Sequence, residues 1–366
     1  MTGIKNITSS MIADLSLGGV FLATGGGGDP YIPRLLTERL LERHGPVTLL
    51  DAQDLADDAH IITLGAVGAP TVSLELLSRE DEAVEALRAY EKETGKQVDA
   101  IVAFEIGGGN SLLPLMAGAA SGLPVIDGDG MGRALPEAQM MTFPIMGVKP
   151  TPAVSVDYCG NTEVLSAPDT LAYEPLIRDF AMRSGGMVVA AEHPMTGLQL
   201  KESVVPGTVS FSIALGNMLR LRRGAAEDLL EPLRALFSGS IYGECRLLAT
   251  GKVTDKTTKV VGGFDVGEAI IEPFGANSTP LTITIRNEYL LATQGDQIRA
   301  SVPDLIVIVE ADTGEPINAE RLRYGQRVAV FAIGAPAAYR TERALKFVGP
   351  KAFGFAHDYL PLEQLD

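Results

Sequence analysis

Residues 100–127 have the sequence AIVAFEIGGGNSLLPLMAGAASGLPVID, in which two apolar runs flank a glycine-rich turn and a helix-like segment. Residues 100–104 and 124–127 are apolar on both faces and rich in branched side chains, as strands covered on both sides tend to be. Residues 110–121 between them are helical by pattern. A strand, a helix and a strand in this order form a parallel pair, so the stretch predicts an α/β sheet.

The alternation of helices and strands extends from this stretch toward the N-terminus. Residues 20–24 are predicted to be a strand that runs into four glycines. Other strands are predicted at residues 47–50 and 60–64, and helices at residues 10–15, 30–43 and 73–93. We therefore expect residues 1–167 to form an α/β domain, a mostly parallel sheet with helices, that carries the glycine-rich loops.

The pattern changes after about residue 168. Helices are predicted at residues 174–184 and 209–237. The chain then becomes a series of strands separated by Gly, Pro, Asn and Asp, among them residues 281–285, 305–309 and 327–331. We expect residues 168–366 to form a mainly β domain with a leading helical segment.

The composition limits the classes of partner. The chain has 366 residues, 46% of them hydrophobic, and a formal net charge of −16, which disfavours binding to nucleic acid or to an anionic membrane. Neither a membrane span nor a signal peptide is visible in the sequence. Cys159 and Cys245 are too few for a disulfide framework or a four-ligand zinc site, so we expect a cytoplasmic protein. The apolar strands also predict a homo-oligomer.

Three polar, glycine-rich loops are expected to follow strands, and the first is TGGGGDP at residues 24–30. Bare backbone amides beside a helix N-terminus can hold an anion, so Gly26, Gly27, Gly28 and Asp29 are predicted to bind substrate. The spacing matches neither a phosphate loop nor a dinucleotide fingerprint, which makes a nucleotide-dependent enzyme a weak hypothesis. A tight turn without a ligand is the alternative.

The second loop, EIGGGNS at residues 105–111, lies at the carboxyl end of a predicted strand, where open α/β sheets bind ligands. Gly108, Gly109 and Asn110 are predicted to contact substrate, with capping of the next helix as the alternative for Asn110. Glu105 directly follows an apolar strand. Partial burial would raise its pKa and suit it to acid–base catalysis or to a metal.

The third loop, DGDGMGRALPE at residues 127–137, is the densest polar cluster in the chain. Asp127 and Asp129 are predicted to be catalytic, or to hold one divalent metal ion as a cofactor. Arg133 is expected either to neutralise these acids or to bind a substrate carboxylate. A structural turn held by ion pairs is the alternative. Three such loops at three strand ends predict one shared pocket.

The cysteine and histidine side chains give weaker indications of a catalytic role than the three loops do. Cys159 has no histidine near it in the sequence, so inert packing is favoured over a role as nucleophile. His193 is expected to be a solvent-facing loop residue, with a pair between His193 and Glu192 as the alternative. The other histidines are scattered along the chain.

The motifs taken together resemble those of S-methyl thiohydantoin desulfurase domain proteins, which are related by gene context to hydantoinases and oxoprolinases. The motifs are TGGGGDP, EIGGGNS, DGDGMGRALPE, DYCGN, GGFDVG, NEYL, VPDLIVIVEADTG, YGQRVAVFAIG and VGPKAFGF, and they span nearly the whole chain. The resemblance implies an α/β domain joined to a mainly β domain, and a cyclic hydantoin or thiohydantoin-like amide as substrate. Carried over by position, it adds Gly25, Gly107, Glu137, Asn161, Asp255, Asn287, Glu288 and Asp304, whereas Cys159 departs from the family pattern.

Two hypotheses about function follow. In the first, the protein is a hydrolase or desulfurase of a small cyclic amide or thioamide, and a carboxylate among Glu105, Asp127 and Asp129 activates water near the interdomain cleft. Asn161, Asp255, Asn287 and Glu288 would help to bind the substrate. In the second, the protein is a non-catalytic subunit or ligand-binding partner of a hydantoinase-type enzyme.

Overall fold

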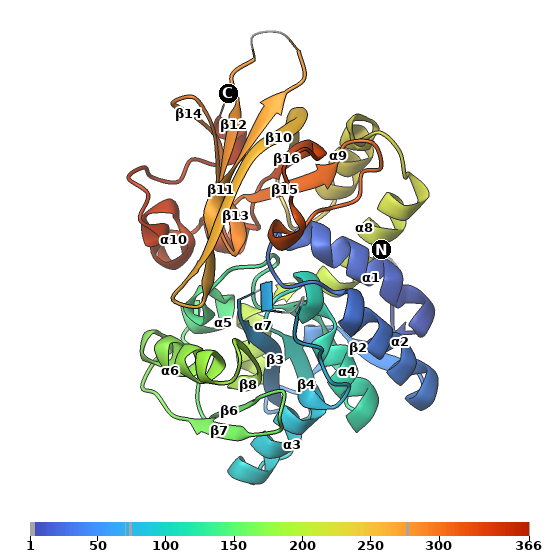
Figure 1. Ribbon diagram of the computed structural model, residues 1–366. Coiled ribbons are helices and arrows are strands. Elements are labelled where there is room, and N and C mark those ends of the chain that lie inside the picture. The colour runs from blue at the N-terminus through green and yellow to red at the C-terminus, as the bar shows by residue number, and fades with distance from the viewer. Residues whose placement is uncertain (1–3, 70, 73–74, 276–277, 366) are drawn as a thin grey trace.

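The computed structural model describes residues 4–69, 71–72, 75–275 and 278–365 (Figure 1). Within these ranges the chain forms two β-sheets, and most of the helices surround the first (Figure 1). No helix in the described ranges is both long enough and apolar enough to cross a membrane.

The first sheet has nine strands in the order β1-β2-β5-β4-β3-β8-β6-β7, with β9 paired to β5. The strands β2, β5, β4 and β3 in its centre are parallel, which confirms the predicted α/β architecture. β8 and β9 also belong to this sheet, although they lie beyond residue 167. The strands are β1 (Asn6–Ile7), β2 (Val47–Leu50), β3 (His60–Gly68), β4 (Ala100–Ala103), β5 (Val125–Asp129), β6 (Ala153–Val156), β7 (Thr162–Leu165), β8 (Met187–Thr196) and β9 (Val205–Pro206).

The second sheet has seven strands, all antiparallel, in the order β14-β13-β12-β11-β10-β16-β15. In β12 the residues Leu281, Ile283 and Ile285 are buried and alternate with threonines, so one face of the sheet packs into a core. This confirms the predicted mainly β part. The strands are β10 (Cys245–Val261), β11 (Phe264–Pro273), β12 (Leu281–Arg286), β13 (Glu288–Gln294), β14 (Gln297–Ser301), β15 (Leu305–Glu310) and β16 (Arg327–Ile333).

Helices cover both faces of the first sheet. Ile62 and Leu64 of β3 belong to one hydrophobic cluster and Ile61 to another, because successive side chains point to opposite faces. The first cluster includes residues of α1 (Ser9–Leu22), α2 (Tyr31–His44), α3 (Glu82–Thr94), α4 (Leu113–Ser121), α8 (Thr208–Leu221) and α9 (Leu230–Ser238). The second includes residues of α5 (Thr142–Ile145), α6 (Thr170–Arg183), α7 (Gly197–Ser203) and α10 (Glu342–Val348).

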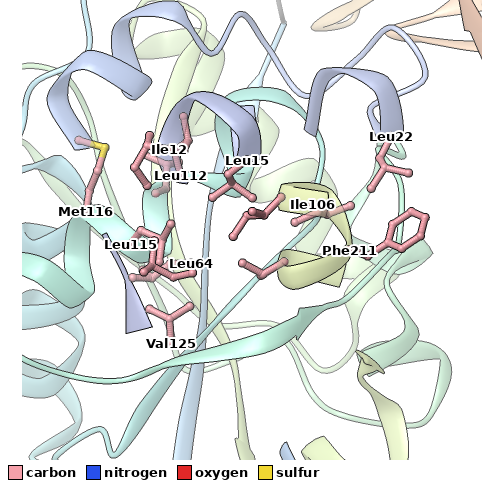
Figure 2. Packing of buried hydrophobic residues seen from close by; sticks show 14 of the residues in the cluster. Ile12, Leu15, Leu22, Leu64, Ile106, Leu112, Leu115, Met116, Val125 and Phe211 are labelled. Carbon is pink, nitrogen blue, oxygen red and sulfur yellow. The ribbon is translucent and has the colours of Figure 1, made fainter. Parts of the chain in front are cut away.

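The helix α1 corrects the prediction of a strand at residues 20–24, since residues 20–22 are the last turn of this helix. α1 packs against α8 so closely that a Cβ on Gly18 would lie 1.9 Å from the Ser212 carbonyl oxygen. Figure 2 shows Ile12 and Leu15 of α1 in the same cluster as Leu112 of the loop before α4. Residues 21–24 are buried, and a buried run has no exposed polar face to reveal its period, which is why the strand prediction was wrong.

Two further helix predictions need correction. Residues 209–237 form two helices, α8 and α9, because the chain turns between them through Gly224 and a 3-10 turn at Ala226–Leu229. The predicted helix at residues 73–93 begins at Glu82, after Asp81 as N-cap. Its first two residues, Ser73 and Leu74, lie outside the described ranges.

Candidate active site

A cavity of about 90 Å³ lies between loops that follow strands of the first sheet and the β12–β13 turn of the second. This volume has room for roughly six water molecules, or for a small organic ring. Its apolar wall contains Phe104, Met131, Leu135 and Met141. The polar residues of the lining include Glu105, Asn110, Glu137, Glu174, Arg178, Glu192, Asn287 and Glu288, and Gly27 and Gly28 form part of the wall.

The three glycine-rich loops meet beside this cavity. Gly109 N donates to Gly27 O at 2.9 Å, and Ile106 N donates to Asp129 Oδ2 at 2.8 Å. Gly27 has φ +70°, and a Cβ there would lie 2.5 Å from the Gly107 carbonyl carbon. Only glycine fits this crossing of two backbones, so at this position the run of glycines is required by packing.

Glu105 lies at the end of β4 and is 5% exposed. Its Oε1 accepts a 2.6 Å hydrogen bond from Asn110 Nδ2, and its Oε2 accepts from Leu135 N at 3.2 Å. Asn110 is itself fixed because its Oδ1 accepts from Ala66 N. Burial raises the pKa of Glu105 to about 8, against the effect of these hydrogen bonds. This carboxyl group can therefore exchange a proton near neutral pH.

Glu288, the first residue of β13, brings a second buried carboxyl group to the cavity. A Cβ on Gly26 would lie 2.0 Å from Glu288 Oε1, so glycine at 26 allows this close approach. Burial, followed by the charge of Glu105, raises the pKa of Glu288 well above its ordinary value. The neighbouring Asn287 has φ +58°, and its Oδ1 accepts from Asp265 N at 2.8 Å. Two glutamates with raised pKa therefore line one cavity.

A third carboxyl group in the lining, that of Glu192, was not predicted from the sequence. Glu192 is fully buried on β8, accepts a hydrogen bond from the Tyr173 hydroxyl, and its Oε1 lies 3.0 Å from His193 Nδ1. His193 is also fully buried, so the expectation of a solvent-facing residue is wrong. Its φ of +49° lies next to a register shift between β3 and β8, and this bulge turns the ring inward. Bulges of this kind leave no clear sequence signal.

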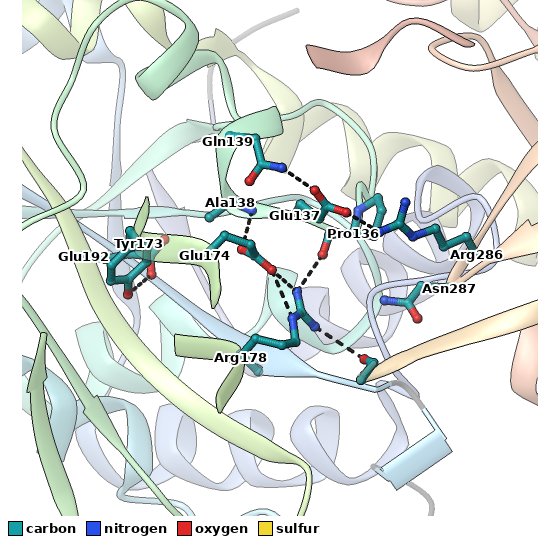
Figure 3. A network of polar contacts seen from close by, with 12 residues as sticks. Pro136, Glu137, Ala138, Gln139, Tyr173, Glu174, Arg178, Glu192, Arg286 and Asn287 are labelled. Atoms are coloured by element: carbon teal, nitrogen blue, oxygen red, sulfur yellow. Dashed lines mark hydrogen bonds and ion pairs between the residues drawn. The ribbon is translucent and has the colours of Figure 1, made fainter. Parts of the chain in front are cut away.

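A polar network closes one side of the cavity (Figure 3). Arg178 donates to both Glu174 and Pro136 O, and Arg286 of β12 pairs with Glu137 of the third loop. The ring of Phe264, at the tip of the β10–β11 hairpin, lies 4.3 Å from the Arg178 guanidinium and 4.4 Å from that of Arg286. The second sheet is thereby anchored to the first around the cavity.

Asp127 and Asp129 are not among the described residues that line the cavity. Asp127 Oδ1 accepts from Ser210 N at 2.9 Å, at the start of α8. Asp129 is fully buried, and its Oδ2 accepts from the backbone N–H groups of Ile106, Met131 and Gly132. Burial raises the pKa of Asp129 to about 7. Its carboxyl group holds the second and third loops together.

We expect Asp129→Ala to lower the free energy of unfolding by at least about 3 kcal/mol, because three buried N–H groups would lose their acceptor. Asp129→Asn keeps one oxygen as acceptor and should remain within about 1 kcal/mol of the wild type at pH 6. Urea unfolding of both variants checks this. Equal stability of the two variants would contradict the role of Oδ2 as a clamp.

The other predicted site residues lie around the cavity or away from it. Arg133 is fully buried, and its guanidinium donates to protein oxygens alone, among them Pro303 O and Thr24 Oγ1. Asp29 Oδ1 accepts from Tyr31 N, at the first residue of α2, and Asp29 pairs with Arg321. Asn161 donates to Asp157 in the turn after β6, and Asp255 lies on β10. Asp304 accepts from Ala335 N and from the Tyr359 hydroxyl.

Cys159 is exposed, which corrects the expectation that it packs in a core.

Within the described ranges, no three side chains of His, Cys, Asp or Glu converge as a metal site. The carboxylates of Asp127 and Asp129 are each engaged by backbone N–H groups. The five glutamates of the cavity lining are held instead by Asn110, Arg178, Arg286 and Tyr173, or packed against Gly26. Their raised pKa values suit Glu105 and Glu288 to acid–base chemistry.

Comparison with known proteins agrees with this architecture. The model of the S-Me-THD-like N-terminal domain matches residues 10–167, and that of the S-Me-THD-like C-terminal domain matches residues 168–362. A crystal structure of a protein from Chromobacterium violaceum, a structural genomics target, is similar in fold, with a TM-score of 0.82 and 23% identity over 98% of this chain and 100% of the other. No curated protein matches the chain. The chain belongs to the S-Me-THD-like family, whose two domain models together cover residues 10–362.

Proposed function

We propose that this protein is a hydrolase or desulfurase that acts on a small cyclic amide or thioamide of the hydantoin or thiohydantoin class. The observation that carries the proposal is the pair of buried glutamates, Glu105 and Glu288, on one small cavity. Family membership supports the substrate class, since the family is named for thiohydantoin chemistry. The cavity volume and its apolar wall suit a small ring.

The two glutamates divide the proton transfers between them. Glu105 is the general base that takes a proton from water as its oxygen attacks the ring carbon. Glu288 is the acid that protonates the departing nitrogen or sulfur, because burial and the negative charge of an ionised Glu105 both favour its protonated form. One ionised and one protonated carboxyl group in the same site are a common acid–base arrangement.

The remaining lining residues orient the ring. Phe104 and Met131 pack against its faces, and the backbone N–H groups of Gly27 and Gly28, which also line the cavity, would stabilise a developing oxyanion or thiolate. Glu192, braced by Tyr173, accepts a hydrogen bond from a ring N–H group. The divalent ion considered at Asp127 and Asp129 has no part in this scheme.

The proposal is tested by incubating the purified protein with hydantoin, thiohydantoin and S-methyl thiohydantoin. Loss of ring absorbance and release of free thiol are followed over time. We expect turnover of at least one ring, and its loss by about 10²-fold or more in Glu288→Gln. Glu268→Gln, an exposed glutamate of β11, is the matched control and should retain full activity.

Binding of these rings without turnover would favour the second hypothesis, a ligand-binding partner of a hydantoinase-type enzyme. The substrate class is wrong if none of the three rings is turned over and isothermal titration detects binding of none of them. The homo-oligomer expected from the sequence stays a prediction.

A further inference from the structure

A second and larger cavity lies apart from the candidate active site. Its volume is about 540 Å³, within the range of sites for small organic ligands. Residues of α1, α2, the end of α8 and the loop between β15 and β16 line it, and these helices lie side by side in Figure 1. Leu17, Val20 and Leu219 form aliphatic parts of its wall.

The lining of this cavity is rich in arginine. Arg34, Arg220, Arg223 and Arg321 line it, and their paired acids are Glu38, Asp14, Glu315 and Asp29. The chain as a whole carries a formal net charge of −16. Four guanidinium groups gathered in one hollow offer hydrogen-bond donors to an anion, which most of this acidic surface would repel.

Two of the arginines are held in place by pairs with buried carboxylates, Arg220 by Asp14 outside the lining and Arg321 by Asp29 within it. Arg220 makes a bidentate pair with Asp14, which is 6% exposed, through its Nε at 2.6 Å and its Nη2 at 3.1 Å. Arg321 pairs through Nε and Nη2 with Asp29, which is 9% exposed. A guanidinium fixed in this way loses little entropy when it binds a ligand.

The outer edges of these guanidinium groups are available. Within the described part of the chain, Nη1 of Arg220 and Nη1 of Arg321 have no hydrogen-bond partner, and neither have Nε and Nη1 of Arg223. The side chains of Arg220, Arg223 and Arg321 are 52%, 66% and 57% exposed. Each of the three can therefore donate to a carboxylate without releasing its present acid.

We propose that this cavity binds a small dicarboxylate with an aliphatic stem. The arginines come from two separate parts of the fold, Arg220 and Arg223 from the end of α8 and Arg321 from the loop before β16, which suits a ligand with an anionic group at each end. The aliphatic side chains accommodate the stem between them. A single compact anion such as phosphate has no stem to pack against the aliphatic side chains of the wall.

Isothermal titration with glutarate tests the proposal, with butyrate as the monocarboxylate of similar stem and with ionic strength held constant by sodium chloride. We expect glutarate to bind at least about tenfold more tightly than butyrate, since a second charged pair forms. Arg223→Gln should weaken glutarate binding about tenfold. Among the described residues its side chain pairs only with the exposed Glu315, so the fold should be unaffected.

The matched control is Arg183→Gln. Arg183 of α6 is 55% exposed and pairs with Glu163 of β7 and with Asp179 of α6, outside the cavity. Its affinity for glutarate should equal that of the wild type. Equal affinities for glutarate and butyrate would overturn the proposal, and so would unchanged glutarate binding in Arg223→Gln. Binding of an Asp- and Glu-rich peptide without binding of glutarate would overturn it too, because the cavity would then be a protein docking surface.

Discussion

Glu105→Gln is expected to lower kcat/KM for the ring substrate by about 10³-fold, while the protein becomes more stable at alkaline pH. The substitution removes the proposed base and keeps its shape. The amide oxygen of the new glutamine can take the place of Oε1 and accept from Asn110 Nδ2, so that only the longer hydrogen bond, from Leu135 N at 3.2 Å, is lost. Loss of activity would therefore not follow from loss of structure.

The pH dependence gives this prediction a second readout. Burial raises the pKa of Glu105 to about 8, and the base must be ionised to act. In the wild type, kcat/KM should rise about tenfold per pH unit below pH 8 and level off above it. In Glu105→Gln the small remaining rate should lack this rise.

The same pKa shift has the opposite effect on stability. A carboxyl group whose pKa is higher in the folded state than in the unfolded state stabilises the fold at low pH, and this stabilisation is lost as the pH rises through the folded value. Between about pH 5 and pH 8 the wild type should therefore lose stability, and Glu105→Gln should lose less. Urea unfolding at the two pH values measures the difference.

Glu320→Gln is the matched control for Glu105→Gln. Glu320 is 5% exposed, its pKa is raised by burial to about 7, and it is not among the described residues of the cavity lining. This variant should change the pH dependence of stability and leave kcat/KM as it is. Full activity in Glu105→Gln, with the same pH profile as the wild type, would remove Glu105 from the mechanism.

The sequence predicts the centre of the first sheet well because its signals there are local. Residues 100–104 are apolar and branched, and a glycine-rich turn follows, so the strand β4 and the loop that carries Glu105 could be placed without any distant contact. Residues 281–285 alternate in the same local way and form β12. The family motifs then added Asn287 and Glu288, which line the cavity.

Features that depend on distant contacts could not be predicted. The helix α1 packs against α8 at Gly18 and Ser212, two residues that lie far apart in the sequence. Glu192 lines the cavity because β8 returns to pair with β3 and is bulged at His193. Asp129 has the sequence context of a catalytic acid, yet its oxygen is occupied by three N–H groups that only the folded loops bring together.

The largest effect on stability is expected from Arg133→Met, which should lower the free energy of unfolding by at least about 3 kcal/mol. Arg133 is fully buried, and its guanidinium donates to Ala134 O, Pro303 O, Asp304 O and Thr24 Oγ1 at 2.8 to 2.9 Å. It thus joins the first glycine loop, the third loop and the start of β15. Methionine fills a similar length but leaves these buried oxygens without a donor.

The effect of Arg133→Met should also reach the candidate active site. The positive charge of Arg133 opposes the rise in the pKa of both Glu105 and Glu288, so its removal should raise both pKa values further. The rise of kcat/KM with pH should then shift to higher pH in the fraction of the variant that remains folded.

Arg327→Met is the control for the stability measurement. Arg327 forms an exposed pair with Asp312, and the substitution should change the free energy of unfolding by no more than about 0.5 kcal/mol. If urea unfolding shows a similarly small change for Arg133→Met, the three segments are held together by packing alone, and the buried guanidinium is dispensable to the fold.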